Sequence, residues 1–423
     1  MIETHRHRNR RHSTFTIAGT ALAGLVAMGG CNSDGSNGNA DLSPTPDLAF
    51  VVGPHGAPPQ VVNAGGDVLA SPVFVPVFFS NDAVAVTAPL TEFLSKVGGT
   101  PYWTANTSEY GVGAGTSTPP VMLTETMTGT IDDAAIQTWL AGKLNGNDPA
   151  FPAATANSIY VLNYPAGVTI TLGGQQSCMS FGAYHSDLAL DVAHAGAYVS
   201  YAVIPRCSGG NGLTSMQNST SATSHELIEA ATDPYPNHAP AFSTVDTDHR
   251  YWSRTLGGGE TGDMCAQDRL SFTKFPELDF TVQRSWSNAA ALAGHDPCVP
   301  ALANSVYFNA VPVFPDIIAS GPNGMFMIPG VHVPVGQSKT IDLQLFSDGD
   351  TGGTWALDAE DITMPTTPRY KFVFDPATGQ NGDTVHLTIS TLVASSRGTA
   401  TFVINSRQTG KVHQWFGYIG DKP

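Results

Sequence analysis

Apolar residues recur at helical spacing twice in the first half of the chain. Four of them predict one helix that opens at Pro89 and buries a single face: Leu90, Phe93, Leu94 and Val97. Four more predict a second helix that starts at Asp132: Ile136, Trp139, Leu140 and Leu144. Runs rich in β-branched and aromatic residues predict strands at 73–79, 158–163 and 197–204. The third run is almost entirely apolar and predicts a central strand, whereas Pro76 leaves the first as either a buried or an edge strand.

The pattern changes after Pro300, where helical spacing disappears. Four runs of short-strand type follow, with Gly, Asp and Asn turns between them: 340–346, 371–375, 384–390 and 399–405. Such a series predicts an all-β sandwich of immunoglobulin-like type at residues 303–423. Pro-rich stretches near 297–315 mark its boundary with a preceding α+β domain, which contains a mixed sheet and occupies residues 61–300.

The N-terminus reads as an export signal. Four Arg and three His at residues 5–12 precede an apolar, Gly-interrupted stretch that ends in Cys31 and is shorter than the roughly 20 residues of a spanning helix. Residues 27–31 resemble a bacterial lipoprotein signal, in which the Cys is lipidated and becomes the new N-terminus. The alternative is an ordinary signal peptide that is cut nearby and leaves Cys31 unpaired.

The lipoprotein interpretation divides the N-terminal region in two. Residues 1–31 form the signal peptide, and residues 32–60, rich in Ser, Gly, Asn and Pro, form a flexible linker. We therefore expect an exported protein, located in the bacterial cell envelope or outside the cell. Its only attachment to the membrane is expected to be the lipid.

The composition indicates a folded chain and argues against one class of partner, nucleic acid. Charged residues make up 13% of the chain, where about 25% is typical, and 41% are hydrophobic, so the chain is expected to fold. The formal net charge is -16. A nucleic-acid-binding protein needs a basic surface, so this composition argues against nucleic acid as a partner.

Four Cys remain after Cys31: Cys178, Cys207, Cys265 and Cys298. An even number in an exported chain predicts disulfides, and three pairings are possible. We favour Cys178 with Cys207 and Cys265 with Cys298, because loops of about thirty residues close within one domain and contribute roughly 3 to 4 kcal/mol each. Metal binding by these Cys is the weaker interpretation, since no two have CxxC spacing.

The segment 224–234 carries the most specific chemistry. It predicts a helix with N-cap choices at residues 219–221 and an end at Pro234. On that helix His225 and Glu229 lie one turn apart and can bind one metal ion, while Glu226 is rotated by about a hundred degrees. Glu226 then stands where a general base takes a proton from water. The motif is HExxH with the second His replaced by Glu; the alternative is a solvated helix face with an incidental His.

A catalytic zinc site needs a third protein ligand. The Gly-rich segment 257–265 supplies two candidates, of which Glu260 is the first choice and Asp263 the second. Either could instead orient a ligand or cap a loop. Asp233 is a further possible ligand, but its place at the helix end and before a proline favours a capping or turn role. His185 and His249 are lesser candidates, because a lone His is more often structural.

Several blocks in fixed order resemble the phosphate-induced, EXORDIUM-like family of secreted proteins and its bacterial relatives, over residues 61–300. These blocks are 184–186, 201–205, 225–234, Trp252, 260–265 and 282–288. The resemblance implies a zincin-like domain, similar to metallopeptidases in its metal-binding helix. It implies that His225 and Glu229 are ligands, that Glu226 is the base, and that the block of Glu260 and Asp263 supplies the remaining ligand. The β domain lies outside the resemblance.

Two functions follow as hypotheses. The first is a secreted or surface-anchored zinc endopeptidase that acts on a peptide or protein. Two anionic ligands reduce the positive charge that Zn²⁺ retains, so a water bound to it would be less acidic. Mn²⁺ or Ca²⁺ is therefore an alternative cofactor, and a purely structural ion is a further alternative. The second hypothesis is a non-catalytic adhesion lipoprotein with a structural or degenerate metal site, whose β domain binds polysaccharide or another cell-surface ligand.

Overall fold

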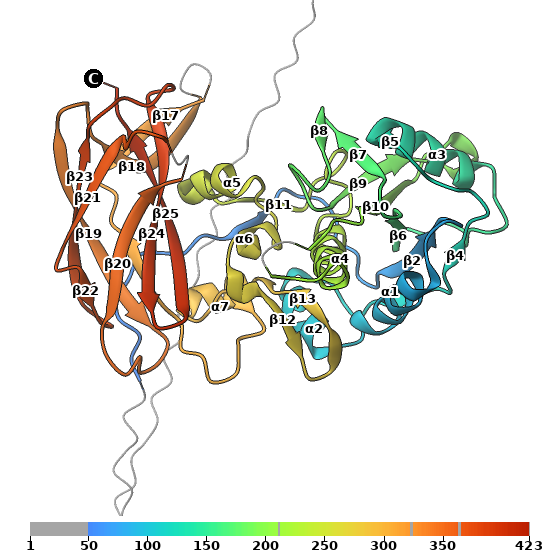
Figure 1. The fold of residues 1–423 in the computed structure, drawn as a ribbon, viewed down its shortest axis with the longest axis horizontal. Coiled ribbons are helices and arrows are strands. Elements are labelled where there is room, and N and C mark those ends of the chain that lie inside the picture. The colour runs from blue at the N-terminus through green and yellow to red at the C-terminus, as the bar shows by residue number, and fades with distance from the viewer. Residues whose placement is uncertain (1–49, 210–211, 322–324, 363–364, 423) are drawn as a thin grey trace, which may run out of the picture. The chain divides into compact units, whose positions relative to one another are not determined.

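The computed structural model describes residues 50–422 except 210–211, 322–324 and 363–364 (Figure 1). Residues Phe50–Pro423 form one compact unit. The predicted signal peptide, the lipidated Cys31 and most of the predicted linker lie outside the described residues. Within the described part, no helix has the length and apolar character needed to cross a membrane.

A mixed sheet organises the first half of this unit. Its strands, in spatial order, are β3 (Thr116–Ser117), β2 (Val73–Phe78), β6 (Ser158–Asn163), β10 (Tyr198–Ile204) and β9 (Tyr184–Ala189), with β4 (Val121–Met122) also beside β2. β2, β6 and β10 are parallel, and β9 runs antiparallel to β10 at the edge. All three predicted strands are confirmed, and β2 is interior. Along one edge of β2, β3 pairs with the residues before Pro76 and β4 pairs with the residues after it. Pro76 lies between these two pairings, where no strand on that edge needs its amide.

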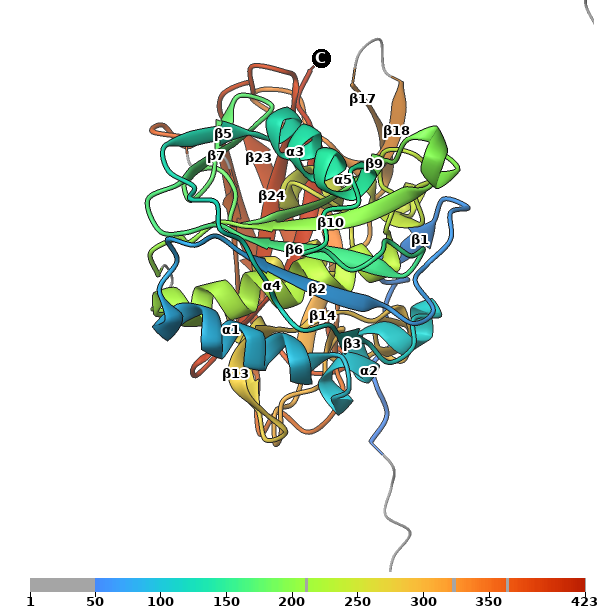
Figure 2. The ribbon, with the colours of Figure 1, turned by 90° about the vertical axis from the view of Figure 1, so that its right-hand side faces the viewer.

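Helices cover both faces of this sheet (Figure 2). The helices on these faces are α1 (Val84–Val97), α2 (Pro101–Thr107), α3 (Asp133–Asn145) and α4 (Ser215–Thr232). Three shorter helices follow along the chain: α5 (Arg250–Leu256), α6 (Asp263–Ala266) and α7 (Asn288–Leu292). Side chains alternate along β6, so Tyr160 packs in the cluster that contains α3, whereas Ile159 packs in the cluster that contains α1, α2 and α4. The strand alternation thus builds a three-layered α/β/α arrangement.

The predicted helix faces are confirmed, but one start was wrong. The four apolar residues of α1 are buried, yet the helix begins at Val84 and encloses Pro89. Pro89 falls in the second turn of the helix, where it removes one intrahelical hydrogen bond. In α3, Asp132 is the N-cap and accepts a hydrogen bond from the amide of Ala135, as a helix that starts there requires.

α4 is buried along most of its length although it is rich in Ser and Thr. Their hydroxyls donate to carbonyls of the same helix, as Ser219 does to Ser215 and Thr223 to Ser219. The predicted N-cap at 219–221 was wrong, because the helix starts one turn earlier, where Thr214 and Gln217 form a capping box. The helix ends at Thr232, two residues before Pro234, as predicted.

Shorter strands form small sheets around this core. These strands are β1 (Val61–Asn63) with β11 (Phe242–Val245), β5 (Thr130–Asp132) with β7 (Thr169–Leu172) and β8 (Gln175–Gln176), β12 (Phe272–Phe275) with β13 (Leu278–Gln283), and β14 (Ser285–Trp286) with β15 (Cys298–Val299). Four 3₁₀ turns occur among the described residues: Ser108–Tyr110, Val192–His194, Thr247–His249 and Arg269–Ser271.

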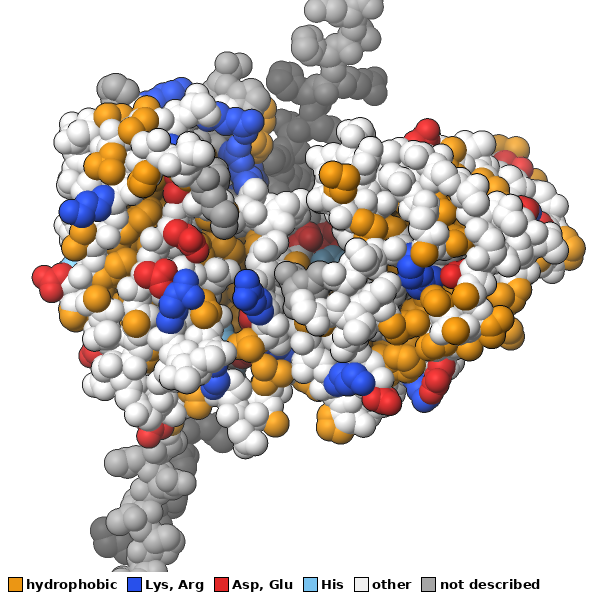
Figure 3. All heavy atoms as spheres, in the orientation of Figure 1, with side chains coloured by type: hydrophobic (Ala, Val, Ile, Leu, Met, Phe, Trp, Pro, Cys, Tyr) orange, Lys and Arg blue, Asp and Glu red, His pale blue; other side chains and the backbone are white. Residues whose placement is uncertain are grey.

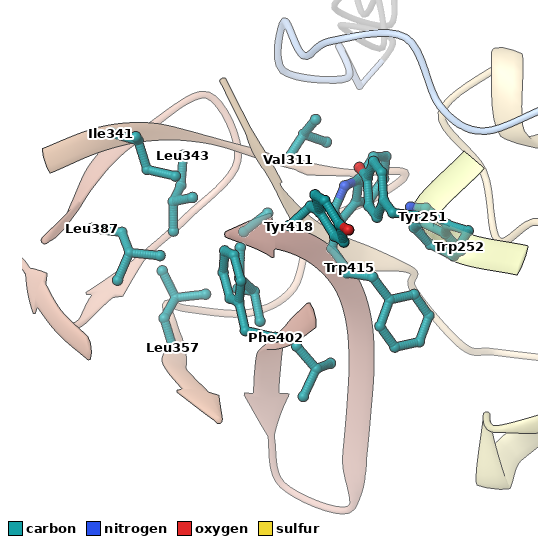
Figure 4. Close-up of a cluster of buried hydrophobic side chains, with 14 of the residues drawn as sticks. Tyr251, Trp252, Val311, Ile341, Leu343, Leu357, Leu387, Phe402, Trp415 and Tyr418 are labelled. Carbon is teal, nitrogen blue, oxygen red and sulfur yellow. The ribbon is translucent and has the colours of Figure 1, made fainter. Parts of the chain in front are cut away.

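The C-terminal part consists of two sheets. One orders β16 (Phe308–Pro312), β19 (Ser338–Ser347), β23 (Thr384–Thr391) and β21 (Tyr370–Asp375). The other orders β17 (Asp316–Ser320), β18 (Phe326–His332), β25 (Lys411–Gly420), β24 (Thr399–Gln408), β20 (Trp355–Asp361) and β22 (Thr378–Gly379). All four predicted runs are strands. Leu343 and Leu387 of the first sheet share a core with Leu357 and Phe402 of the second (Figure 4). The protein is thus a mixed α/β chain in which strand predominates.

The hydrophobic core continues from the helical part into the β part. On α5, Trp252 packs edge-to-face on Phe416 of β25, with ring centroids 4.8 Å apart. Residues before Gln60 also contact the β part, because the ring of His55 stacks on Phe346 at 3.9 Å and the amide of Gly53 donates to Asn381. The end of the predicted linker is therefore held against the β part.

Both predicted disulfides are confirmed: Cys178 with Cys207 and Cys265 with Cys298. We expect replacement of Cys265 and Cys298 by Ser to lower the free energy of unfolding by about 3 kcal/mol, because the crosslink limits the unfolded chain. Urea unfolding of the oxidised protein measures this loss. An unchanged midpoint in the double variant would show that this disulfide does not stabilise the fold.

His413 of β25 gives the stability a pH dependence. It is buried between the rings of Tyr307 and Phe308, and burial lowers its pKa to about 4. An unfolded imidazole titrates near pH 6.5, so the unfolded state binds the proton first as the pH falls. We expect this residue to contribute a stability loss of roughly 3 kcal/mol between about pH 6.5 and pH 4. A His413→Gln variant should show a correspondingly shallower loss in urea unfolding, and parallel pH profiles would contradict the assignment.

Candidate metal centre

α4 presents the three predicted residues of the HExxE motif to one buried site. His225 and Glu229 lie one turn apart, and His225 Nε2 is 3.1 Å from Glu229 Oε2. Glu226 is buried, and one of its carboxylate oxygens lies within 4.8 Å of a carboxylate oxygen of Glu229. The helical periodicity that the sequence predicts therefore produces the predicted pair, with the third residue beside it.

The loop that leads into α6 fixes the carboxylate of Glu229. Its Oε1 accepts hydrogen bonds from the amides of Gly262 and Asp263, at 3.1 and 3.0 Å, and Oε2 is left to face His225. A side chain at position 262 would crowd both residues of the pair. A Cβ added there would lie only 2.8 Å from both Glu229 Oε1 and His225 Nδ1, closer than real Cβ atoms approach.

Gln283 of β13 fixes the ring of His225. Its Nε2 donates to the carbonyl of Gly262 at 2.7 Å, so its Oε1 must face His225 Nδ1, which is 3.1 Å away. An acceptor at Nδ1 requires a proton there, and the lone pair is then on Nε2, the atom next to Glu229. The sequence did not single out Gln283 as a site residue, although it lies within the 282–288 block.

Asp263 completes the first group of ligands. Its Oδ1 is 3.9 Å from His225 Nε2, and ligand atoms of His225, Glu229 and Asp263 lie within 4.8 Å of one another. Glu260 instead lies near His185, with its Oε1 3.6 Å from His185 Nε2. The geometry therefore favours Asp263, the second choice, over Glu260 as the ligand beside His225.

His185 is the residue that the sequence underestimated. Its Nδ1 lies 3.5 Å from Glu226 Oε2 and 3.6 Å from Glu229 Oε2, so it is part of the site. It lies on β9, which pairs with β10, and this pairing brings it beside α4 from a distant part of the chain. His249 is structural, since its Nδ1 bonds to Asp246 at 2.9 Å. Asp233 is the C-cap residue of α4, and its Oδ1 accepts from the amide of Ala241 at 2.6 Å.

The charges of the cluster are unbalanced. Five carboxylates surround two imidazoles: Glu226, Glu229, Asp233, Glu260 and Asp263 around His185 and His225. Burial alone would lower the pKa of His185, but Glu260, Glu226 and Glu229 raise it well above its ordinary value. Burial would also lower the pKa of His225, but Glu229 and Glu226 raise this pKa well above its ordinary value.

The carboxylates respond in opposite directions. Burial and the charge of Glu229 raise the pKa of Asp263 to about 7, and burial raises the pKa of Glu260 well above its usual range. Burial would also raise the pKa of Glu229, but the two imidazoles lower it. Without a cation the cluster balances its charge only by taking up protons, so it strongly favours a positive ion.

The donor set fits a divalent cation. The free atoms of His225 and Glu229 point to the same place, and each is oriented by a hydrogen bond at its other side. One imidazole nitrogen with carboxylate oxygens suits Zn²⁺ and Mn²⁺. Figure 3 shows acidic and histidine side-chain atoms recessed below the surrounding surface near the middle of this face.

Comparison with known proteins adds little. No protein-family model matches the chain, and no curated protein matches it. Among solved structures, surface layer protein SbsC (domains 1–6) has a TM-score of 0.17 and 16% identity, covering 26% of this chain and 13% of its own length. The titin M3 domain has a TM-score of 0.16 and 13% identity, covering 26% of this chain and 97% of that domain. Titin M4 has a TM-score of 0.15 and 13% identity over 22% of this chain and 86% of that domain.

Proposed function

We propose that the protein is a metal-dependent hydrolase that cleaves peptide bonds, with a zincin-like, EXORDIUM-related domain at residues 61–300. The observation that carries the proposal is the 3.1 Å approach of His225 Nε2 to Glu229 Oε2, with Glu226 beside the pair. His225, Glu229 and Asp263 would hold the cation, Zn²⁺ in the first instance and Mn²⁺ or Ca²⁺ as alternatives. When bound, the cation would polarise a carbonyl and make a nearby water more acidic.

The protein's own residues supply the rest of the chemistry. Glu226 is the general base, because its carboxylate is buried next to the ligand pair without being held by the loop that fixes Glu229. His185 Nδ1, 3.5 Å from Glu226 Oε2, keeps the base oriented. Gly262 and Gln283 hold the ligands from behind, so the geometry is ready before substrate arrives.

The edge of the mixed sheet supports a peptide as the substrate. β9 is the last strand in the order, and no described strand pairs with its outer edge. It also carries His185, so its free edge runs past the site. An extended peptide can form main-chain hydrogen bonds with such an edge, and this pairing would place one of its carbonyls near the cluster.

The proposed location of the protein, outside the cell or on its surface, rests on its cysteines. Two disulfides indicate an extracellular or surface protein. A lipid anchor on Cys31 would hold the protein at the bacterial envelope, and the two sheets after residue 303 would form an immunoglobulin-like sandwich. That sandwich would bind polysaccharide or another cell-surface ligand.

A second candidate is a non-catalytic surface protein with a structural ion. The excess of carboxylates favours it, since anionic ligands reduce the charge that activates water. Elemental analysis alone does not separate the candidates, because both bind metal.

Digestion of a peptide library by residues 32–423 separates them. We expect cleavage with Zn²⁺ or Mn²⁺, loss of cleavage with a chelator, recovery when metal is restored, and none with His225→Ala. Cleavage that persists unchanged in the chelator and in the variant would refute the proposal. A folded, metal-loaded protein that cleaves nothing would favour the second candidate.

A further inference from the structure

A second group of potential ligands lies behind the ring of His185. Ligand atoms of His185, Asp233 and Glu260 lie within 4.8 Å of one another, and His185 Nε2 is 3.6 Å from Glu260 Oε1. The three residues come from β9, from the C-cap of α4 and from the Gly-rich loop before α6. None of them belongs to the group around His225, which uses Glu229 and Asp263.

Asp233 provides an independent observation. Its side chain is completely buried, and its Oδ1 accepts a hydrogen bond from the amide of Ala241. Its Oδ2 is also buried but accepts no hydrogen bond from any described residue. A buried carboxylate oxygen without a partner is costly, so it indicates that a positively charged ligand belongs at this point.

The charge of the whole cluster leads to the same conclusion. No described Lys or Arg forms an ion pair with any of the five carboxylates, whose ion pairs are with His185 and His225. With both imidazoles neutral and all five carboxylates ionised, one divalent cation would leave three negative charges buried together. A second divalent cation would leave one, which the partly exposed Glu260 can tolerate.

We propose that His185, Asp233 and Glu260 form a second site for a divalent transition-metal cation of the Zn²⁺ or Mn²⁺ type. His185 Nε2 and the carboxylates of Asp233 and Glu260 are its ligands. The carbonyl oxygen of Asp233, 3.1 Å from Nε2, is a further oxygen within reach. In the metal-free protein, a proton on Nε2 makes a hydrogen bond to that carbonyl and occupies the place of the cation.

This site deepens the proposed function and rests on it for the first cation. A cation on Nε2 confines the ring proton of His185 to Nδ1, where it faces Glu226 and Glu229. The second cation therefore positions the base. It also ties β9, the end of α4 and the Gly-rich loop together around the site.

The Asp233→Asn variant tests the second site with little change to the fold. Asn keeps an oxygen for the amide of Ala241 and places an amide group where the unpartnered oxygen was. Elemental analysis and titration with Zn²⁺ or Mn²⁺ alone should give two ions per chain for the wild type and one for Asp233→Asn. The Glu260→Gln variant should also bind one ion per chain. It replaces Asp233→Asn in the test if Asp233→Asn does not fold. His225→Ala should lose the other ion and keep the second.

The outcomes are distinct from those of the hydrolase proposal. Two ions in the wild type and one in Asp233→Asn support the second site even if no peptide is cleaved. One ion per chain in the wild type, or two ions in Asp233→Asn, overturns the second site even if peptide cleavage is active.

Discussion

Glu226→Gln is expected to lower the rate of peptide cleavage by about 10²- to 10⁴-fold, the usual contribution of a general base. Gln has nearly the same shape as Glu but does not accept a proton from water. The amides of Gly262 and Asp263 bond to Glu229 and not to Glu226, so the change leaves the ligand pair in place. Metal content by elemental analysis should therefore equal that of the wild type.

The matched control is Glu92→Gln on α1, whose carboxylate is exposed and pairs with Lys96 on the surface. It should cleave at the wild-type rate. If Glu226→Gln cleaves as fast as this control while both are loaded with metal, Glu226 is not the base. If Glu226→Gln loses its metal, its carboxylate is a ligand, and the roles of the HExxE residues have to be reassigned.

Gly262→Ala is expected to weaken cation binding by about 10- to 100-fold, the usual effect of disturbing a group that orients a ligand. The added methyl would lie 2.8 Å from both Glu229 Oε1 and His225 Nδ1, so one of the two must move. Movement of Glu229 breaks its hydrogen bonds to the loop, and movement of His225 breaks its contact with Gln283.

Gly142→Ala on α3 is the control, because an added Cβ there meets no atom within 4 Å and the site is a helix interior, where Ala is favoured. Its zinc affinity, measured by competition with a chelating dye, should match the wild type. Equal affinity in Gly262→Ala would mean that the loop does not hold the ligands, and the account of the site would be wrong at this point.

Local patterns in the sequence were enough to predict the parts of the site that one helix contains. His225, Glu226 and Glu229 are related by helical periodicity, and Pro234 fixes where the helix ends, so their geometry needs no distant contact. The two disulfides were also predictable, because both close short loops. Strands such as β19 and β24 were predictable because short-strand runs recur after Pro300 with Gly, Asp and Asn turns between them.

The remaining site residues depend on distant pairing. His185 joins the cluster because β9 pairs antiparallel with β10, and Gln283 joins because β13 packs against α4. Local patterns in the sequence contain no signal for either pairing, so His185 was ranked only as a lesser candidate for a ligand. The choice between Glu260 and Asp263 depends on the path of one loop, in which the amide of Asp263 bonds to Glu229 and directs the two carboxylates to different imidazoles.

The most direct test of the central claim is a crystal structure of residues 32–423 grown with Zn²⁺, with anomalous diffraction recorded on both sides of the zinc absorption edge. The account predicts a strong anomalous peak at bonding distance from His225 Nε2, Glu229 Oε2 and a carboxylate oxygen of Asp263. Absence of a peak between these three atoms at full zinc loading would contradict the claim that they converge on a common cation.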